Sequence, residues 1–192
     1  EYIPESKTIA KQYLYQKLLT DSNLLNSNSE LLSFVTENET RNIGKLEGVR
    51  QSIESYFLPD QQTIESLNQT DSLISLYVDS LMHEDENLRQ YFIALLSQLS
   101  QSRNENIELW RNSVSTKLDD AQLINESVTG EDNPTENEKF INSITIKYLN
   151  GSKDSISIYY SFILQIAQQC PYKGGKAVYR ARCFVSLFKD TI

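Results

Sequence analysis

The chain has 192 residues, of which 39% are hydrophobic and 23% charged, and its formal net charge is -8 at pH 7. Nucleic-acid binding depends on a basic surface, so this acidic balance argues against a DNA or RNA partner. No apolar run approaches the ~20 residues that a membrane-spanning helix requires, which argues against membrane insertion. Only four prolines and six glycines are present, which favours long helices over a loop-rich sheet protein.

Three helices are predicted in the first 60 residues, because apolar residues recur there at helical spacing. The first two flank the polar break at Asn26 to Asn28, and the third ends at Pro59. Their apolar positions are Ile9, Tyr13, Leu14 and Leu18; then Leu31, Leu32, Phe34 and Val35; then Ile43, Leu46, Val49, Ile53 and Phe57. Gly44 and Gly48, one turn apart beside charged residues, predict close packing of the third helix against another one.

The middle of the chain predicts helices that pack as a bundle. Asp60 is a candidate N-cap for a helix with Ile64, Leu67, Ile74, Val78 and Leu81. A second apolar series follows at Leu88, Phe92, Leu95 and Leu99, and a third at Ile107, Trp110, Val114 and Leu118. Between these two series, Ser100 to Asn106 is entirely polar. It is either a turn that makes a hairpin or a solvated stretch of continuous helix, and periodicity does not choose between them.

The last third predicts three more helices. A loop at Thr129 to Asp132 leads into Asn133-Pro134-Thr135-Glu136, which reads as an N-cap, a first-turn proline and a returning carboxylate. Gly151 is placed to end this helix, and Cys170-Pro171 ends the next one. The apolar positions are Phe140, Ile141, Ile144 and Tyr148; then Ile156, Tyr159, Tyr160, Ile163 and Ala167; and finally, from Gly175 onward, Ala177, Val178, Ala181, Phe184, Val185 and Phe188.

These patterns together predict an all-α protein, an antiparallel bundle of about seven helices, with strand-like alternation scarce throughout. We expect one domain over residues 1–192. The ends at Glu1 and Ile192 look like cuts through a longer polypeptide, so we expect the chain to be part of a larger protein.

The most distinctive segment is the turn Gln168 to Arg182, which joins the last two predicted helices. Pro171 prevents the preceding helix from continuing, and Gly174-Gly175 allows backbone angles that other residues avoid. The motif residues are Cys170, Pro171, Gly174, Gly175, Ala177, Val178, Tyr179, Ala181 and Arg182. Arg182 lies at the edge of the apolar face, where it could donate hydrogen bonds to helix-end carbonyls beside the turn.

This segment resembles one in large secreted proteins of the type IX secretion system, where Cys-Pro-x-x-Gly-Gly-x-Ala-Val-Tyr-x-Ala-Arg lies in a helical region upstream of a sorting domain. The stretch from Ile124 to Ser127, and that from Glu136 to Ile144, are also similar. The likeness covers Ile124 to Phe188, about a third of the chain, and Cys183 departs from it. It implies a secreted or cell-surface location, with other domains of the same parent protein as partners.

The two cysteines, Cys170 and Cys183, invite a disulfide because secreted proteins oxidise their thiols. If the last helix begins at Gly175, Cys183 lies roughly 12 Å along it, whereas bridged α-carbons lie within ~7 Å, so the geometry argues against a bridge. Cys170 would then pair with a residue beyond Ile192 or stay buried and unpaired. Cys183 would be accessible unless its helix is covered on both sides.

His83 is the only histidine, and Glu84, Asp85 and Glu86 follow it. Consecutive residues of a helix point about 100° apart, so this set does not converge on a metal ion, and we interpret it as a solvated helix end. Catalysis by His83 and a cysteine would need a fold that brings them together, which the sequence does not exclude. We expect no catalytic residues, no cofactor and no metal.

Basic residues are concentrated near the end of the chain, with seven from Lys147 onward against two acidic ones. Lys173, Lys176 and Arg180 could form a patch that binds a glycan or an acidic protein. The other interpretation is pairing with acidic helices of the same bundle, which is the commoner use of such asymmetry.

The sequence therefore predicts a non-enzymatic helical spacer or protein-interaction module of an exported cell-surface or secreted bacterial protein. The alternative is a glycan- or protein-binding module that uses the basic, tyrosine-rich final helices. An enzyme is a third hypothesis, with no motif that specifies a reaction.

Overall fold

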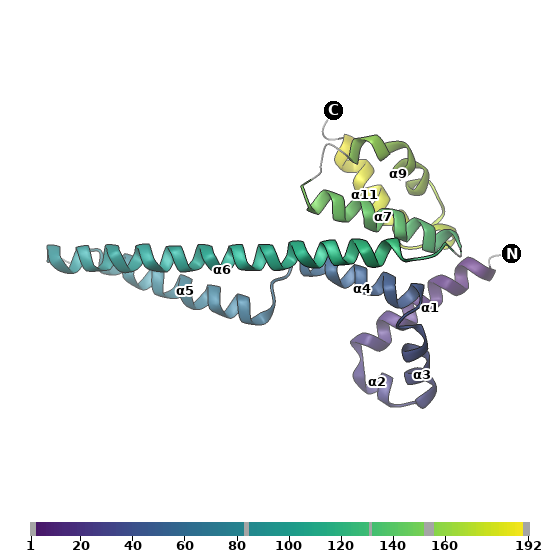
Figure 1. The fold of residues 1–192 in the computed structure, drawn as a ribbon, viewed down its shortest axis with the longest axis horizontal. Helices are drawn as coiled ribbons and strands as arrows, with labels where there is room; N and C mark the ends of the chain where they lie inside the picture. The colour runs from purple at the N-terminus through teal and green to yellow at the C-terminus, as the bar shows by residue number, and fades with distance from the viewer. Residues whose placement is uncertain (1–2, 83–84, 131, 152–155, 190–192) are drawn as a thin grey trace. The chain divides into compact units, whose positions relative to one another are not determined.

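Helices form all the regular structure that the computed structural model describes, which covers residues 3–82, 85–130, 132–151 and 156–189. This part of the chain holds ten α-helices and one 3-10 helix, and no strand, so the predicted all-α class is confirmed. The chain divides into two compact units, residues 1–54 with 117–192 and residues 55–116. We describe each unit by itself (Figure 1).

The first unit begins with four helices: α1 (Ile3–Thr20), α2 (Ser22–Asn26), α3 (Ser29–Asn38) and α4 (Asn42–Ser55). The predicted break at Asn26 to Asn28 is confirmed, and Asn28 caps α3 by accepting a hydrogen bond from the Glu30 amide over 2.8 Å. The predicted face of α1 is partly wrong. Tyr13 is 66% exposed and Leu14 is also exposed, whereas Gln12, Tyr15 and Leu18 are buried.

The two glycines of α4 differ in their surroundings. Gly44 lies against the carbonyl oxygens of Asn38 and Glu39 at the end of α3, where even one extra methyl group would clash, so a glycine is needed where the chain turns into α4. Gly48 has open space around it, so the predicted close packing is wrong for that residue. Phe57, predicted to be the last apolar position, follows the end of α4 and is exposed.

The rest of the first unit consists of the end of α6 (Glu86–Glu126), α7 (Asn133–Leu149), η1 (Ser157–Tyr159), α9 (Tyr160–Ala167), α10 (Pro171–Gly174) and α11 (Ala177–Lys189). Gly151, at φ 86°, follows α7 as predicted. The cap of α7 is one residue earlier than expected. Asp132 accepts from the Thr135 amide over 3.0 Å, and Pro134 lies in the first turn.

The core of this unit lies between α7, α9 and α11. Its buried residues are Ile141, Ile144, Ile156, Ile163, Ile166, Ala167, Ala177, Val178, Ala181, Phe184 and Val185. The predicted apolar faces of these three helices are therefore confirmed. Two edge-to-face aromatic pairs, Tyr148 with Phe184 and Tyr160 with Phe188, extend the core along α11.

The second unit is an antiparallel hairpin made by α5 (Gln61–Ser80) and the part of α6 up to residue 116. Asp60 caps α5, as predicted, by accepting from the Thr63 amide over 2.8 Å. The polar stretch Ser100 to Asn106 is continuous helix, not a turn. Its polar side chains are used across the hairpin, because Arg103 pairs with Asp71 at 2.6 Å and Asn106 donates to Ser66 over 3.1 Å.

Within the residues that the structure places, no helix is both long enough and apolar enough to span a membrane.

Candidate functional site

The motif identified in the sequence forms a tight corner in the first unit. Cys170 has an extended backbone (φ -71°, ψ 128°) and precedes the single turn of α10, which Pro171 begins. The amides of Lys173 and Gly174 both donate to the Cys170 carbonyl oxygen over 2.9 Å. The chain thus reverses between α9 and α11 within a few residues, so that the two helices pack along each other.

Each glycine of the corner is required for a different reason. Gly175 has φ 73° and ψ -165°, a conformation that is open almost only to glycine. Gly174 is helical, but a β-carbon there would lie 2.5 Å from Cγ2 of Val178 and 2.6 Å from Oε1 of Gln169. Gly174 is therefore needed because there is no space for a side chain, and Gly175 is needed for its backbone angles.

Arg182 fastens the end of α9 to α11, as predicted. Its Nε donates to the carbonyl oxygen of Ala167 over 2.9 Å, and its Nη2 donates to that of Gln169 over 3.2 Å. The last carbonyls of a helix have no partner within the helix, so the guanidinium satisfies groups that would otherwise need water. It also lies 5.7 Å from the ring centre of Tyr179.

Two asparagines of α7 hold the corner from the other side. Asn133 donates to Oε1 of Gln169 over 2.8 Å and to the Lys173 carbonyl over 3.1 Å. Asn137 donates to the same Gln169 oxygen over 2.7 Å and to the Gly174 carbonyl over 3.1 Å. Asn133, which the sequence suggested as a helix cap, is therefore a contact between α7 and the corner.

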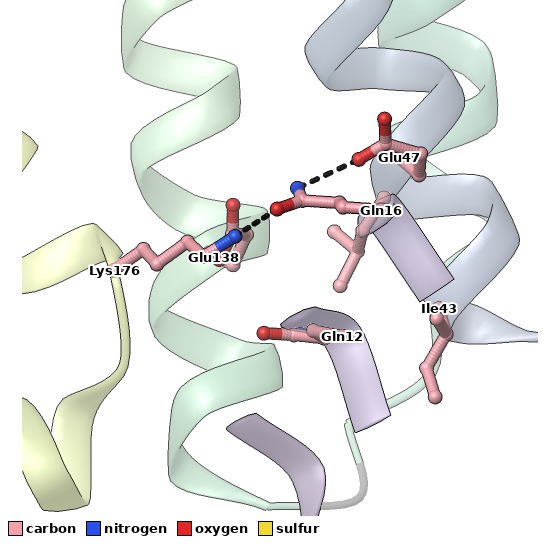
Figure 2. Close-up of a pocket in the computed structure, with 7 residues that line it drawn as sticks. Gln12, Gln16, Ile43, Glu47, Glu138 and Lys176 are labelled. Carbon is pink, nitrogen blue, oxygen red and sulfur yellow. Dashed lines mark hydrogen bonds between the residues drawn. The ribbon is translucent and has the colours of Figure 1, made fainter. Parts of the chain in front are cut away.

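Beside the corner, polar side chains from three helices and from Lys176 surround a small recess. Its lining residues are Gln12, Gln16, Ile43, Leu46, Glu47, Glu138 and Lys176. Figure 2 shows Gln16 between Lys176 and Glu47. The Lys176 ammonium donates to Oε1 of Gln16, and Nε2 of Gln16 donates to Glu47 over 2.7 Å. One α1 amide therefore connects α4 to the residue that precedes α11.

Arg180 makes a second polar connection, between α11 and α7. Its Nη1 donates to Oδ1 of Asn142 over 2.7 Å, and its Nη2 pairs with Glu138 at 3.0 Å. Asn142 is fully buried, and Glu138 is only 7% exposed. The sequence left two interpretations of the basic residues open. For Arg180, the structure supports the one in which a basic residue pairs with an acidic residue of the same unit.

Burial and hydrogen bonding shift the acid–base properties of this cluster. Burial lowers the pKa of Lys176, and the nearby Glu138 and Glu47 carboxylates only partly oppose this. Burial alone would raise the pKa of Glu47, but hydrogen bonds from Arg50, Gln16 and Gln51 outweigh it and the pKa is lowered. Glu47 is therefore held as a carboxylate at neutral pH.

The recess has room for about one water molecule, since its free volume is about 10 Å³. Gln12 is 8% exposed, and its Nε2 has no hydrogen-bond partner among the described residues. Ligand pockets for small organic molecules have volumes of roughly 300–1,000 Å³. The arrangement therefore connects helices and leaves very little space between them.

The remaining motif and candidate binding residues divide between core and surface. Ala177, Val178 and Ala181 are fully buried, whereas Lys173 and Tyr179 are exposed. The three basic residues suggested as a patch thus differ in environment. Lys176 and Arg180 are half-buried and bound to side chains of the same unit, whereas Lys173 is exposed.

Both cysteines are free and exposed, so the expectation that an unpaired Cys170 would be buried is wrong, and Cys183 is accessible. His83 and Glu84 lie outside the described residues. Elsewhere, in the ranges that the structure covers, no group of three or more His, Cys, Asp or Glu residues is placed to hold a metal ion.

Sequence reasoning missed four polar residues of the recess, Gln12, Gln16, Glu47 and Glu138. Glu47 lies one turn after Ile43 and is buried, and Glu138 lies one turn before the buried Asn142. A charged residue on a buried helix face is a detectable signal. The partners of these polar residues cannot be found in the same way, because they are distant in the chain. Gln16 and Lys176, which form one of these contacts, are 160 residues apart.

No family model, curated protein or solved structure that was compared with the chain matched it.

Proposed function

We propose that this chain is a non-enzymatic helical module of an exported protein, in which the Cys170–Gly175 corner fixes α9 and α11 and acts as a structural fastening. The observation that carries the proposal is that three basic residues of the Gln168 to Arg182 segment bind groups on other helices. Arg182 binds the end of α9, and Arg180 and Lys176 bind side chains of α7 and α1. These groups hold helices together.

The hairpin of the second unit supports the spacer part of the proposal. α5 has 20 residues, which corresponds to about 30 Å of helix at 1.5 Å per residue. Stacking of Tyr77 on Phe92, with ring centres 5.8 Å apart, and the Asp71–Arg103 ion pair tie its two helices together. Two packed helices resist bending better than one, so the hairpin can serve as a stiff arm of the module.

The alternative, a glycan-binding surface, has less support, because two of its three basic residues are engaged within the unit. Charge reversal at Lys176 and Arg180 separates the two functions. A structural role predicts that Lys176→Glu with Arg180→Glu lowers the melting temperature, since each change places a carboxylate beside Glu47 or Glu138. A binding role predicts an unchanged melting temperature and the loss of binding on a glycan array.

The export part of the proposal rests on the resemblance of the motif to type IX secreted proteins. It is tested in the source bacterium with an antibody to this chain, by comparing intact and lysed cells. Labelling of intact cells or of the medium supports export. Labelling of lysed cells alone contradicts it.

A further inference from the structure

The described residues of the second unit do not enclose a buried core of their own. Among the described hydrophobic residues from 55 to 116, only Val114 is as buried as the core residues of the first unit. The large apolar residues exposed instead are Phe57, Leu58, Ile64, Leu73, Leu76, Val78, Met82, Leu88, Tyr91, Ile93 and Leu109. A unit of ~60 residues is marginally stable even with a buried core. We therefore expect this exposed apolar surface to pack against a partner.

The contact seam between α5 and α6 follows the three-four spacing of a coiled coil. Its residues, none of them exposed, are Leu67, Thr70, Ile74 and Tyr77 on α5 and Phe92, Leu96, Leu99, Arg103, Asn106 and Trp110 on α6. The helices are antiparallel. The residues that immediately precede the seam residues of α5 therefore lie on the same side of the hairpin as those that immediately precede the seam residues of α6.

We call this side the leucine face. Its members are Ser66, Gln69, Leu73, Leu76, Tyr91, Leu95, Gln98, Ser102, Glu105 and Leu109. Leu73 is 42% exposed, Leu76 57%, Tyr91 58% and Leu109 67%. Two-stranded coiled coils confine apolar residues to the seam, whereas helices of larger bundles add apolar positions beside it. The leucine face therefore has the pattern of a helix pair that packs against further helices.

The distribution of charged residues makes a second copy of the chain a suitable partner for the leucine face. Residues 55–116 contain nine acidic and three basic residues, yet Glu105 is the only charged member of the leucine face. Depletion of charge is typical of the centre of a protein–protein interface. Two leucine faces can therefore meet without placing the acidic groups of the two hairpins against each other.

The available area also fits a second hairpin better than a single helix. A face about 30 Å long and two helices, or about 20 Å, wide covers roughly 600 Å². Pairing two such faces would bury about 1,200 Å² in total, the lower bound for a specific interface, whereas one helix would cover about half of the face.

We propose that the chain forms a dimer through the leucine face, in which two α5–α6 hairpins pair about a two-fold axis into a four-helix assembly. This inference goes beyond the proposed function and does not depend on the chain being exported.

Sedimentation equilibrium of the full chain, from about 1 to 100 µM, tests the proposal. The expected mass at the upper end is twice that of the 22.1 kDa chain. Leu73→Glu with Tyr91→Glu should raise the dissociation constant by about 100-fold or more, because two charges would then be buried at the interface. The matched control is Val78→Glu with Ile93→Glu: both residues are 49% exposed, and each follows a seam residue, so they lie on the opposite side and should leave the dimer intact.

Three results would overturn the proposal. They are a monomeric wild-type chain throughout the range, a dimer that survives Leu73→Glu with Tyr91→Glu, and equal dissociation of the control variant. Circular dichroism at the same concentrations reports whether each variant keeps its helices. If the double variant loses helicity, Tyr91→Lys alone replaces it. This milder change should still weaken the dimer at least tenfold, and an unchanged dissociation constant contradicts the assignment.

Discussion

Arg182 on α11 and Ala167 at the end of α9 are joined by a 2.9 Å hydrogen bond from the guanidinium Nε to the carbonyl oxygen. We expect Arg182→Met to lower the free energy of unfolding by about 1–2 kcal/mol, because the carbonyls of Ala167 and Gln169 lose their donor. Urea denaturation measures this change. Arg111→Met is the control: its ion pair with Glu108 is exposed, so the loss should stay below about 0.5 kcal/mol. Equal losses in both variants would contradict a fastening role for Arg182.

The glycines provide a prediction with an internal control. Gly175→Ala should cost about 2–3 kcal/mol, because alanine must adopt φ 73° and ψ -165°. Gly174→Ala should cost about 1–3 kcal/mol through contact of the new methyl with Val178. Gly48→Ala should instead stabilise the chain by about 0.5–1 kcal/mol, since it lies within α4 with open space around it. The three melting temperatures test this order, and a stabilising Gly175→Ala would contradict the assigned backbone conformation.

Local signals in the sequence predicted much of the corner and little of the recess. Pro171, Gly175, Asp60 and Gly151 act through their own backbone or the next turn, so residue type and position were enough. Asp132 and Asn133 are both good capping residues in adjacent positions, and the sequence pointed to the second one. What decides between them is a contact distant in the chain, since Asn133 reaches Gln169 and Lys173.

The longer-range features depended on partners that periodicity does not reveal. Ser100 to Asn106 is stable as helix because Asp71 and Ser66 on α5 meet its polar side chains. The face of α1 was misjudged because Gln12 is buried in place of Leu14. A hydropathy pattern places glutamine on the surface, and only the recess formed by α4, α7 and Lys176 explains its burial.

The Arg180–Glu138 pair should show strong coupling. Removal of the guanidinium by Arg180→Met leaves the Glu138 carboxylate buried without its cation, at an expected cost of about 3 kcal/mol. Arg180→Met combined with Glu138→Leu should cost less than the sum of the two single changes, since neither charge then remains. A double-mutant cycle by urea denaturation gives the coupling energy, and a value near zero would show that the two side chains do not interact in solution.

Stability should fall in acid partly because of Glu47. The pKa of this carboxyl is lower in the folded chain than its ordinary value of 4.5. A group with a lowered folded-state pKa stabilises the fold fully above its unfolded pKa and loses that contribution as the pH falls through the folded value. Protonation would remove the charge that pairs with Arg50 and would weaken the hydrogen bonds that Glu47 accepts from Gln16 and Gln51.

We therefore expect the free energy of unfolding to decrease as the pH falls below 4.5. Glu47→Gln should be less stable than the wild type at pH 7 and should lose less stability on acidification, because it has no carboxylate to protonate. Urea denaturation at a series of pH values gives both curves. Glu65→Gln, on an exposed position of α5 outside the seam and the leucine face, is the control and should keep the acid dependence of the wild type. If Glu47→Gln and the wild type lose stability in parallel, the carboxylate does not stabilise the contact between α1 and α4.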